Sequence, residues 1–237
     1  MYKKSLTLIE LIVVSVIILL IIEPTTISIS FIIFIIFVLV TFTSVTIFIK
    51  SKFPSWIGQS GENFVSEELH QLDITYYRTL DDLMLPSNGN SSFTQIDHVV
   101  VSNFGIFCIE TKSYKGWVFG NVNQKYWTQV IYRFRNRFYN PLFQNFAHIK
   151  AIENLLGLRR LKLPIVSLVV FPRADRLKIS GTDSVGGIDD IMRKIGNYTT
   201  IIYTDFERNE IFNLLSSANI FDEGVRKLHS KEVKELR

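Results

Sequence analysis

The chain has 237 residues, of which 47% are hydrophobic and 20% are charged. This composition excludes a disordered or low-complexity protein and provides enough apolar material for one or two domains. The single cysteine, Cys108, excludes an intrachain disulfide and a cysteine-rich zinc site. The net charge of +4 is too small to indicate a polyanionic partner by itself.

The first 52 residues form an apolar segment that predicts a membrane anchor. Residues 27–49 contain no charged side chain and, at about 1.5 Å per helical residue, are long enough to cross a hydrocarbon core of about 30 Å. Residues 6–22 predict a second span, in which Glu10 lies near one end and can reach the interface. Pro24 predicts a turn between the two spans. We therefore expect one or two transmembrane helices, and two would form a hairpin in the lipid bilayer.

Lysines flank both outer ends of this segment, at positions 3, 4, 50 and 52, whereas the turn has no lysine or arginine. The positive-inside rule therefore predicts that both ends, and the soluble domain that follows, lie on the cytoplasmic side of the cell membrane. The N-terminal residues 3–14 also resemble the processing motif of type IV pilins. Ser5 in place of that family's glycine, and a hairpin in place of one helix, argue against this alternative.

The remaining chain has the pattern of one α/β domain in which helices flank a mixed sheet. Residues 58–61 have a composition typical of a loop. In residues 62–72 the apolar side chains recur at helical spacing, which predicts a helix. Two apolar runs separated by a short turn predict a β-hairpin at residues 96–101 and 106–109. Further strands are predicted at residues 75–80, 117–119, 126–132, 165–171 and 200–203, and further helices at 142–156, 205–215 and 223–228.

The predicted hairpin carries charged residues where its apolar strands end. Glu110 and Lys112 share one face of a strand because side chains alternate. The length of the turn decides whether Asp97 joins them. A two-residue loop at Asn103-Phe104 pairs Asp97 with Glu110, a loop at Phe104-Gly105 pairs it with Lys112, and a three-residue loop turns it to the other face unless a bulge restores the phase.

Two carboxylates beside an ammonium group suit phosphodiester hydrolysis, because hard cations such as Mg²⁺ prefer oxygen ligands and can bind phosphate oxygens. Lys112 could then orient the water and offset developing charge. The alternative is that Glu110 and Lys112 form a surface ion pair worth at most about 1 kcal/mol. His98 follows Asp97 and is expected to face the other way, in a buried hydrogen bond.

Several motifs occur in a fixed order from residue 58 to about residue 171. They are Gly58-x-x-Gly61-Glu62, Leu85-Pro86, Thr94-Gln95-Ile96-Asp97-His98, Gly105-Ile106-Phe107, Ile109-Glu110-Thr111-Lys112, Gly116, Gly120, Trp127, Asn140-Pro141-x-x-Gln144 and Val169-Val170-Phe171. In this order they resemble the nuclease-related domain (NERD) family, a branch of the PD-(D/E)xK nuclease superfamily.

The resemblance implies a restriction-endonuclease-like fold and a division into an anchor (1–52), a nuclease-like domain (53–171) and a C-terminal extension (172–237). It implies that Asp97, Glu110 and Glu62 are ligands of Mg²⁺ or Mn²⁺ and that Lys112 positions water. Gln144 is expected on the inner face of its helix, reaching the site or DNA, and a helix-capping or core-edge amide is the alternative.

Nucleic-acid contacts are predicted for the cations Lys115, Lys125, Arg133, Arg135 and Arg137, which are interleaved with aromatic residues. The three arginines alternate along an extended segment, so they could follow phosphates while the aromatics pack inward. A solvated strand face is the alternative.

The sequence therefore supports the hypothesis of a membrane-anchored, metal-dependent nuclease that hydrolyses phosphodiester bonds of nucleic acid, with DNA as the expected substrate. The alternative is a NERD-fold protein that binds nucleic acid or a protein partner without cutting. Residues 172–237 contain no recognisable motif, and their helices could cover the sheet or form a homodimer contact.

Overall fold

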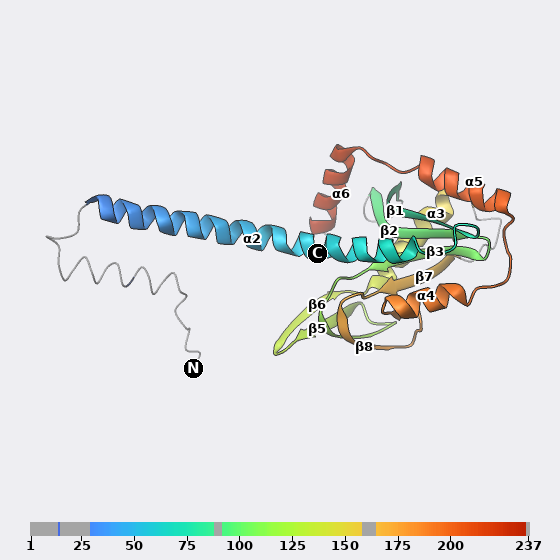
Figure 1. The fold of residues 1–237 in the computed structure, drawn as a ribbon, viewed down its shortest axis with the longest axis horizontal. Helices are drawn as coiled ribbons and strands as arrows, with labels where there is room; N and C mark the ends of the chain where they lie inside the picture. Colours follow the sequence, from blue (N-terminus) through green and yellow to red (C-terminus); the bar gives the residue numbers. More distant parts are fainter. Residues whose placement is uncertain (1–13, 15–28, 88–91, 158–164, 236–237) are drawn as a thin grey trace. The chain divides into compact units, whose positions relative to one another are not determined.

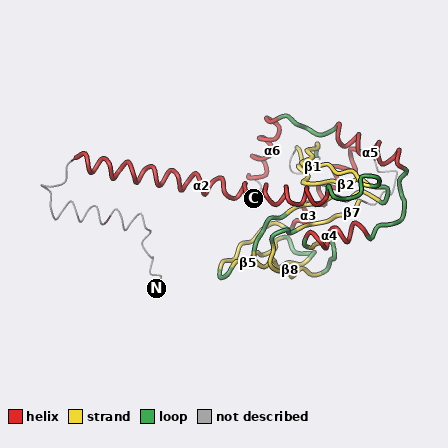
Figure 2. The backbone as a smooth tube through the Cα atoms, viewed as in Figure 1, coloured by secondary structure: helices red, strands yellow, loops and turns green. Residues whose placement is uncertain are grey.

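The computed structural model describes Val14 and residues 29–87, 92–157 and 165–235. The chain divides into two compact units, Met1–Ser55 and Trp56–Arg237. Figure 1 labels the elements along the chain, and Figure 2 distinguishes the helices and strands by colour.

Helix α2 (Ile29–Leu69) begins in the first unit. Most described side chains of residues 34–48 are exposed, including Phe37 and Ile47. The hydroxyl of Thr41 donates to the carbonyl oxygen of Phe37 at 3.0 Å, and Thr43 bonds to Leu39 in the same way at 2.9 Å. These bonds satisfy polar side chains within an otherwise apolar helix.

The predicted transmembrane hairpin has no support in the structure. Apart from Val14, residues 6–22 and the turn at 23–26 lie outside the described residues. In the part of the chain that is described, no helix combines the length and the hydropathy required to cross a membrane. The helix that contains the second predicted span, α2, continues beyond residue 49 to Leu69.

The second unit contains two mixed sheets rather than the single sheet predicted. The first has the strand order β1-β2-β3-β7-β9. Its strands are β1 (Tyr77–Pro86), β2 (Phe93–Ser102), β3 (Gly105–Thr111), β7 (Ile165–Val170) and β9 (Val185–Gly186). The second sheet has the order β6-β5-β4-β8. Its strands are β4 (Gly116–Asn121), β5 (Tyr126–Ile131), β6 (Phe134–Tyr139) and β8 (Ala174–Ser180).

Helices cover both faces of the first sheet (Figure 1). On one face Val99 and Val101 of β2 pack with residues of α3 (Pro141–Leu155) and α5 (Asp205–Ser217). On the other face Val100 packs against α2 and α4 (Ile188–Gly196). Alternate residues of β2 therefore enter different cores, which explains why the strand reads as a continuous apolar run.

Among the described residues, a buried core packs against one face of the second sheet. Val118, Trp127 and Phe138 form a buried core with Phe171, which follows β7. A Cβ atom on Gly120 would lie 2.4 Å from the Trp127 ring, so only glycine allows the ring this close.

Residues 172–237 contribute to both sheets, because β8 pairs with β4 and β9 pairs with β7. The sequence missed β8, β9 and α4, and it placed a strand at residues 200–203 where the structure has none. There the backbone N–H groups of Ile202 and Tyr203 both donate to Asn103 O, at 2.7 and 3.0 Å. The two helices predicted next are present as α5 and α6 (Glu223–Glu235).

The predicted loop at residues 58–61 is instead part of α2, and the predicted helix at 62–72 is the end of the same helix. Gly61 does not break the helix. A Cβ atom at this position would lie 1.5 Å from Ser113 Oγ and 2.8 Å from Ser113 Cβ. The glycine therefore allows α2 to contact the segment after β3, which carries Lys112.

Candidate active site

The β2–β3 hairpin brings Asp97 beside Glu110. Its loop consists of Asn103 and Phe104, and the paired residues run from Ser102↔Gly105 to His98↔Ile109. One further step in this register places Asp97 opposite Glu110, which is the first of the three arrangements considered from the sequence. The backbone pairing of β2 with β3 ends at His98 and Ile109, before this pair. The side chain of Asp97 can therefore turn toward the space between the strands.

Asp97 is held at the point where the two strands separate. Its Oδ2 accepts a hydrogen bond from the backbone N–H of Thr111 at 2.7 Å. Burial raises the pKa of Asp97 well above its usual value, and the nearby carboxylates of Glu110 and Glu62 raise it further. Lys112 opposes these effects without overcoming them. Three carboxylates therefore act on one another at this point of the sheet.

Glu110 is buried and has a cationic or hydrogen-bonding partner on each oxygen. Its Oε1 accepts from Lys112 Nζ at 2.5 Å, and its Oε2 lies 3.0 Å from His148 Nε2. Burial by itself would raise the pKa of Glu110, but Lys112 and His148 outweigh burial and hold the pKa at about 2. Glu110 is therefore a carboxylate at neutral pH. The predicted ion pair with Lys112 is present, but it is buried rather than on the surface.

Lys112 is held between an acid and an amide. Besides Glu110, its ammonium group donates to Gln144 Oε1 at 3.0 Å. Burial lowers the pKa of Lys112, but Glu110 and Asp97 more than compensate, so the pKa is raised overall. The lysine therefore stays protonated and cannot serve as a general base at neutral pH. Gln144 lies on the inner face of α3 and reaches the site, as the first of its two interpretations predicted.

His148 belongs to the site, and sequence reasoning missed it. Its Nε2 faces Glu110, and its Nδ1 lies 2.7 Å from the hydroxyl of Thr94. Both His148 and Thr94 are buried. The sequence did indicate this position, because His148 is four residues after Gln144 and residues at this spacing share a helix face.

Glu62 approaches Asp97 from the opposite side of the sheet. It lies on α2, whereas Glu110 is bonded to α3. Burial raises the pKa of Glu62, His98 and Lys112 lower it, and Glu110 raises it. The three predicted carboxylates are therefore neighbours, but they come from a helix and two strands.

A pocket beside Asp97 is strongly acidic. It is lined by Gln59, Glu62, Asn63, Ser66, Asp81, Asp82, Gln95, Asp97 and His98. His98 Nδ1 lies 2.6 Å from Asp81 Oδ1, which confirms the predicted buried hydrogen bond. His98 and Asp97 both line this pocket, although alternate residues of β2 enter different cores, with Val99 in one and Val100 in the other. Its buried Nε2 has no hydrogen-bond partner among the described residues.

The residues present suit a hard divalent cation in their chemistry. Asp97 and Glu62 offer carboxylate oxygens, which Mg²⁺ and Mn²⁺ prefer. Burial is the main cause of the raised pKa of both groups, and the neighbouring carboxylate of Glu110 raises both further. Among the described residues, however, no three His, Cys, Asp or Glu side chains are already arranged around a point that could hold an ion. Glu110 is engaged by Lys112 and His148 instead.

The cations predicted to contact nucleic acid do not converge on the carboxylates. Lys115 precedes β4, and the others lie on or beside the β5–β6 hairpin, at Lys125, Arg133, Arg135 and Arg137. The prediction that the interleaved aromatics pack inward is wrong for Tyr132, which is 97% exposed, and for Phe134, which is 68% exposed. Phe138 does pack inward. Tyr132 lies in the hairpin turn with a φ of 53°, where no core faces its side chain.

Comparison with known proteins assigns the family. The model of the nuclease-related domain, NERD, matches residues 57–172. An uncharacterized protein of Bacillus anthracis, pXO1-01, is 35% identical over 187 residues, which cover 77% of this chain and 86% of that protein. The chain belongs to the NERD family.

The NERD match contains all the residues brought together above, from Glu62 to His148. Among solved structures, the crystal structure of a protein of unknown function, AF1548, matches with a TM-score of 0.30 and 11% identity. It covers 75% of this chain and 97% of that one. A similarity this low carries no argument about fold or activity.

Proposed function

We propose that this NERD protein is a metal-dependent nuclease that hydrolyses phosphodiester bonds of nucleic acid, with DNA as the expected substrate. The observation that carries the proposal is the position of Lys112. Its protonated ammonium group is held by Glu110 and Gln144 and acts electrostatically on Asp97, which in turn lies close to Glu62. Charged groups placed this way cost folding energy and are not needed for packing.

In the proposed reaction each residue of the chain has a separate task. Asp97 and Glu62 would supply oxygen atoms for Mg²⁺ or Mn²⁺, and Glu110 would join them through an oxygen that it shares with Lys112 or His148. A bound ion would polarise the phosphate and lower the pKa of a water molecule. Lys112 offsets the negative charge that develops on the phosphate oxygens. Gln144 and Glu110 fix the ammonium group of Lys112, and His148 fixes Glu110.

A nuclease assay on the full chain tests the proposal. The purified protein is incubated with plasmid and with single-stranded DNA in Mg²⁺ or Mn²⁺, beside Asp97→Ala and Lys112→Ala. Both variants should lose at least about 100-fold in rate. Lys150→Ala is the control, because Lys150 lies on α3 and forms an exposed pair with Glu153. Equal cutting by all proteins would indicate a contaminant and reject the proposal, as would a folded parent that cuts with neither metal.

A second candidate function is binding of nucleic acid without cutting. Each oxygen of Glu110 already has a partner, Lys112 or His148, so this carboxylate has less capacity to bind a metal ion. This observation favours binding without cleavage. The same assay separates the two, since a binding protein retards DNA on a gel and leaves it intact in either metal.

Location at the cell membrane, with the domain in the cytoplasm, stays a prediction of the sequence. A reporter fused after Arg237 should be active in the cytoplasm, and activity outside the cell would contradict it. Formation of a homodimer also stays a prediction, which light scattering of the purified chain tests.

A further inference from the structure

The face of the second sheet that points away from its core is covered by aromatic and cationic side chains. Tyr126 pairs with Tyr139 across β5 and β6, and Thr128 pairs with Arg137. On the neighbouring strands, Phe119 of β4 pairs with Thr128, and Trp117 of β4 pairs with Arg176 of β8. Directly paired residues share a face, so these side chains form one surface. We call it the outer face, and it comprises Trp117, Tyr126, Arg137, Tyr139, Arg176 and Lys178.

The outer face is unusual because its rings are exposed and cations lie over them. The guanidinium of Arg137 is 5.1 Å from the centre of the Tyr126 ring, and that of Arg176 is 5.4 Å from the centre of the Trp117 ring. Lys178 is 5.1 Å from the Trp117 ring. Trp117 and Tyr126 remain 42% and 44% exposed. Rings that serve only packing are on the other face of the sheet, where Trp127 is buried.

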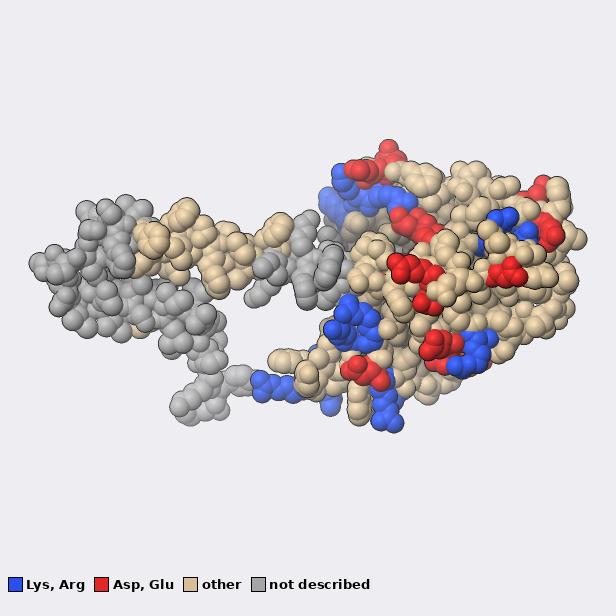
Figure 3. Space-filling view, in the orientation of Figure 1, with Lys and Arg blue, Asp and Glu red and all other residues tan. Residues whose placement is uncertain are grey.

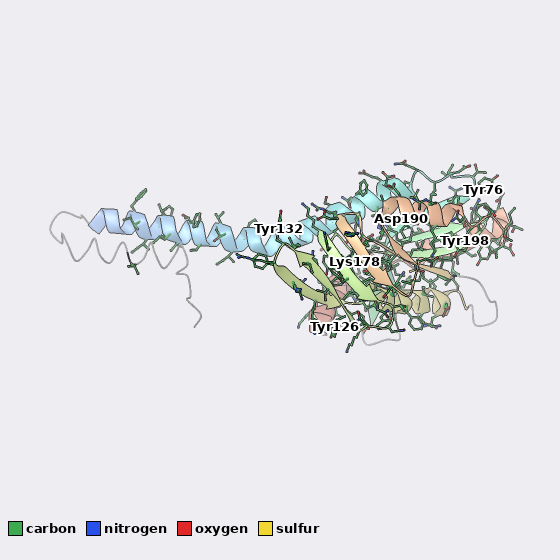
Figure 4. All side chains as sticks on the ribbon, turned by 90° about the horizontal axis from the view of Figure 1, so that it is seen from below. Tyr76, Tyr126, Tyr132, Lys178, Asp190 and Tyr198 are labelled. Carbon is green, nitrogen blue, oxygen red and sulfur yellow. The ribbon has the colours of Figure 1, made fainter. Side chains whose placement is uncertain are left out.

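The charge on this part of the molecule is mainly positive. Residues 115–140 contain five lysines or arginines and no aspartate or glutamate. Strand β8 adds Arg176 and Lys178 against a single acid, Asp175. Lys and Arg side chains project at the lower left of the domain in Figure 3, where Figure 1 shows the β5–β6 hairpin. In Figure 4, Tyr126, Tyr132 and Lys178 are grouped over this sheet, whereas Tyr76 and Tyr198 lie at the opposite end of the domain.

We propose that the outer face binds single-stranded nucleic acid, with unstacked bases on its rings and phosphates on its cations. Exposed rings interleaved with Lys and Arg are the combination that binds single strands without sequence preference. In a duplex the bases are stacked on one another, so their faces are not available to Trp117 or Tyr126.

A row of rings leads from the outer face to α3, the helix that carries Gln144. The Tyr126 and Tyr139 rings are 6.1 Å apart, and the Tyr139 and Phe143 rings are also 6.1 Å apart. Gln144, the residue after Phe143, bonds to Lys112. A strand held on the outer face would therefore extend toward α3, and with further nucleotides toward Lys112. This last step rests on the proposed function, whereas binding to the outer face requires no cleavage.

The test measures binding of a fluorescein-labelled oligothymidylate to the purified full chain in EDTA, by fluorescence anisotropy. Tyr126→Ala and Trp117→Ala should each weaken binding by about 5- to 150-fold, the range found when a stacking ring is removed. Tyr126→Phe keeps the ring and should bind like the parent. Arg137→Ala should also weaken binding and reduce the slope of log affinity against log salt by about 0.7.

Matched controls come from the opposite end of the domain and from α4. Tyr76→Ala removes an exposed ring and Arg193→Ala removes an exposed cation, and neither should change the affinity. Unchanged melting temperatures show that the variants are folded, and a variant that melts early is replaced by Tyr126→Leu or Trp117→Leu.

Parent affinity in the Tyr126→Ala and Trp117→Ala variants would overturn the inference, as would equal affinity for a duplex of matched length. Binding to vesicles of phosphatidylserine, lost in the same variants while the oligonucleotide does not bind, would assign the surface to a membrane instead. The binding and cleavage assays together distinguish a failure of the nuclease proposal from a failure of the outer-face proposal. A parent that binds through the outer face but never cuts rejects only the nuclease, and one that cuts while these variants bind normally rejects only the outer face.

Discussion

Glu110 and His148 lie within hydrogen-bonding distance in the buried centre of the domain, with 3.0 Å between Oε2 and Nε2. The other imidazole nitrogen of His148 lies 2.7 Å from the hydroxyl of Thr94. Polar contacts therefore connect Thr94 of β2, His148 of α3 and Glu110 of β3. They also orient Glu110, which accepts a hydrogen bond from Lys112.

Replacing His148 with alanine should destabilise the fold. The change leaves one oxygen of a buried carboxylate without its partner, and a hydrogen bond to a charged group contributes about 1.5–3 kcal/mol. We expect a loss of about 2 kcal/mol in the free energy of unfolding, measured by urea denaturation. Lys150→Ala, two residues away and exposed, should change stability by less than about 0.5 kcal/mol. Equal effects of the two changes would contradict the role assigned to His148.

The stability of the fold should decrease in acid partly because of Glu110. Its pKa is about 2 in the folded protein, below the ordinary value of 4.5. A lowered pKa means that the folded state binds fewer protons, so the stabilisation is present above about pH 4.5 and is lost as the pH falls toward 2. Unfolding experiments in urea at a series of pH values should show this loss in the parent and a smaller one in Glu110→Gln. The same slope in both proteins would contradict the assignment.

Gly61→Ala should destabilise the contact between α2 and the segment after β3. The new Cβ atom would meet Ser113 Oγ at 1.5 Å and Ser113 Cβ at 2.8 Å, so one element must move. Overpacking of this kind costs about 1–3 kcal/mol. The double variant Gly61→Ala, Ser113→Gly removes both clashing atoms and should recover part of the loss. Gly196→Ala is the matched control, since no atom lies within 4 Å of its Cβ position, and it should be neutral or stabilising.

Gln144→Ala should reduce the cleavage rate without abolishing it. Gln144 accepts a hydrogen bond from the ammonium group of Lys112. The positive charge of Lys112 is balanced by Glu110, which this substitution leaves in place. Groups that orient a catalytic residue typically contribute about 10- to 100-fold. We therefore expect kcat to fall by roughly tenfold and KM to change little, measured by steady-state kinetics on single-stranded DNA. A change as large as that of Lys112→Ala would mean that Gln144 contacts the substrate itself.

Local pattern was sufficient for much of the fold. The hairpin of β2 and β3, the helix α3 after Asn140-Pro141 and the strands β4 and β5 follow from apolar runs, turn residues and a proline at a helix start. Strand β8 was missed because half-exposed residues alternate with charged ones along it. It becomes a strand by pairing with β4, a partner more than fifty residues earlier in the chain.

For the site, the sequence by itself determined the chemical groups, because Glu110 and Lys112 lie at the end of one strand of the hairpin and Asp97 lies on the other. It left the register open, and the two-residue loop at Asn103-Phe104 decided it. Only the tertiary structure decided that His148 contacts Glu110, that Glu62 approaches Asp97 from α2, and that Tyr126 and Trp117 face solvent. These relationships depend on how separate elements pack, and the free energy of that packing comes from contacts between residues far apart in the chain.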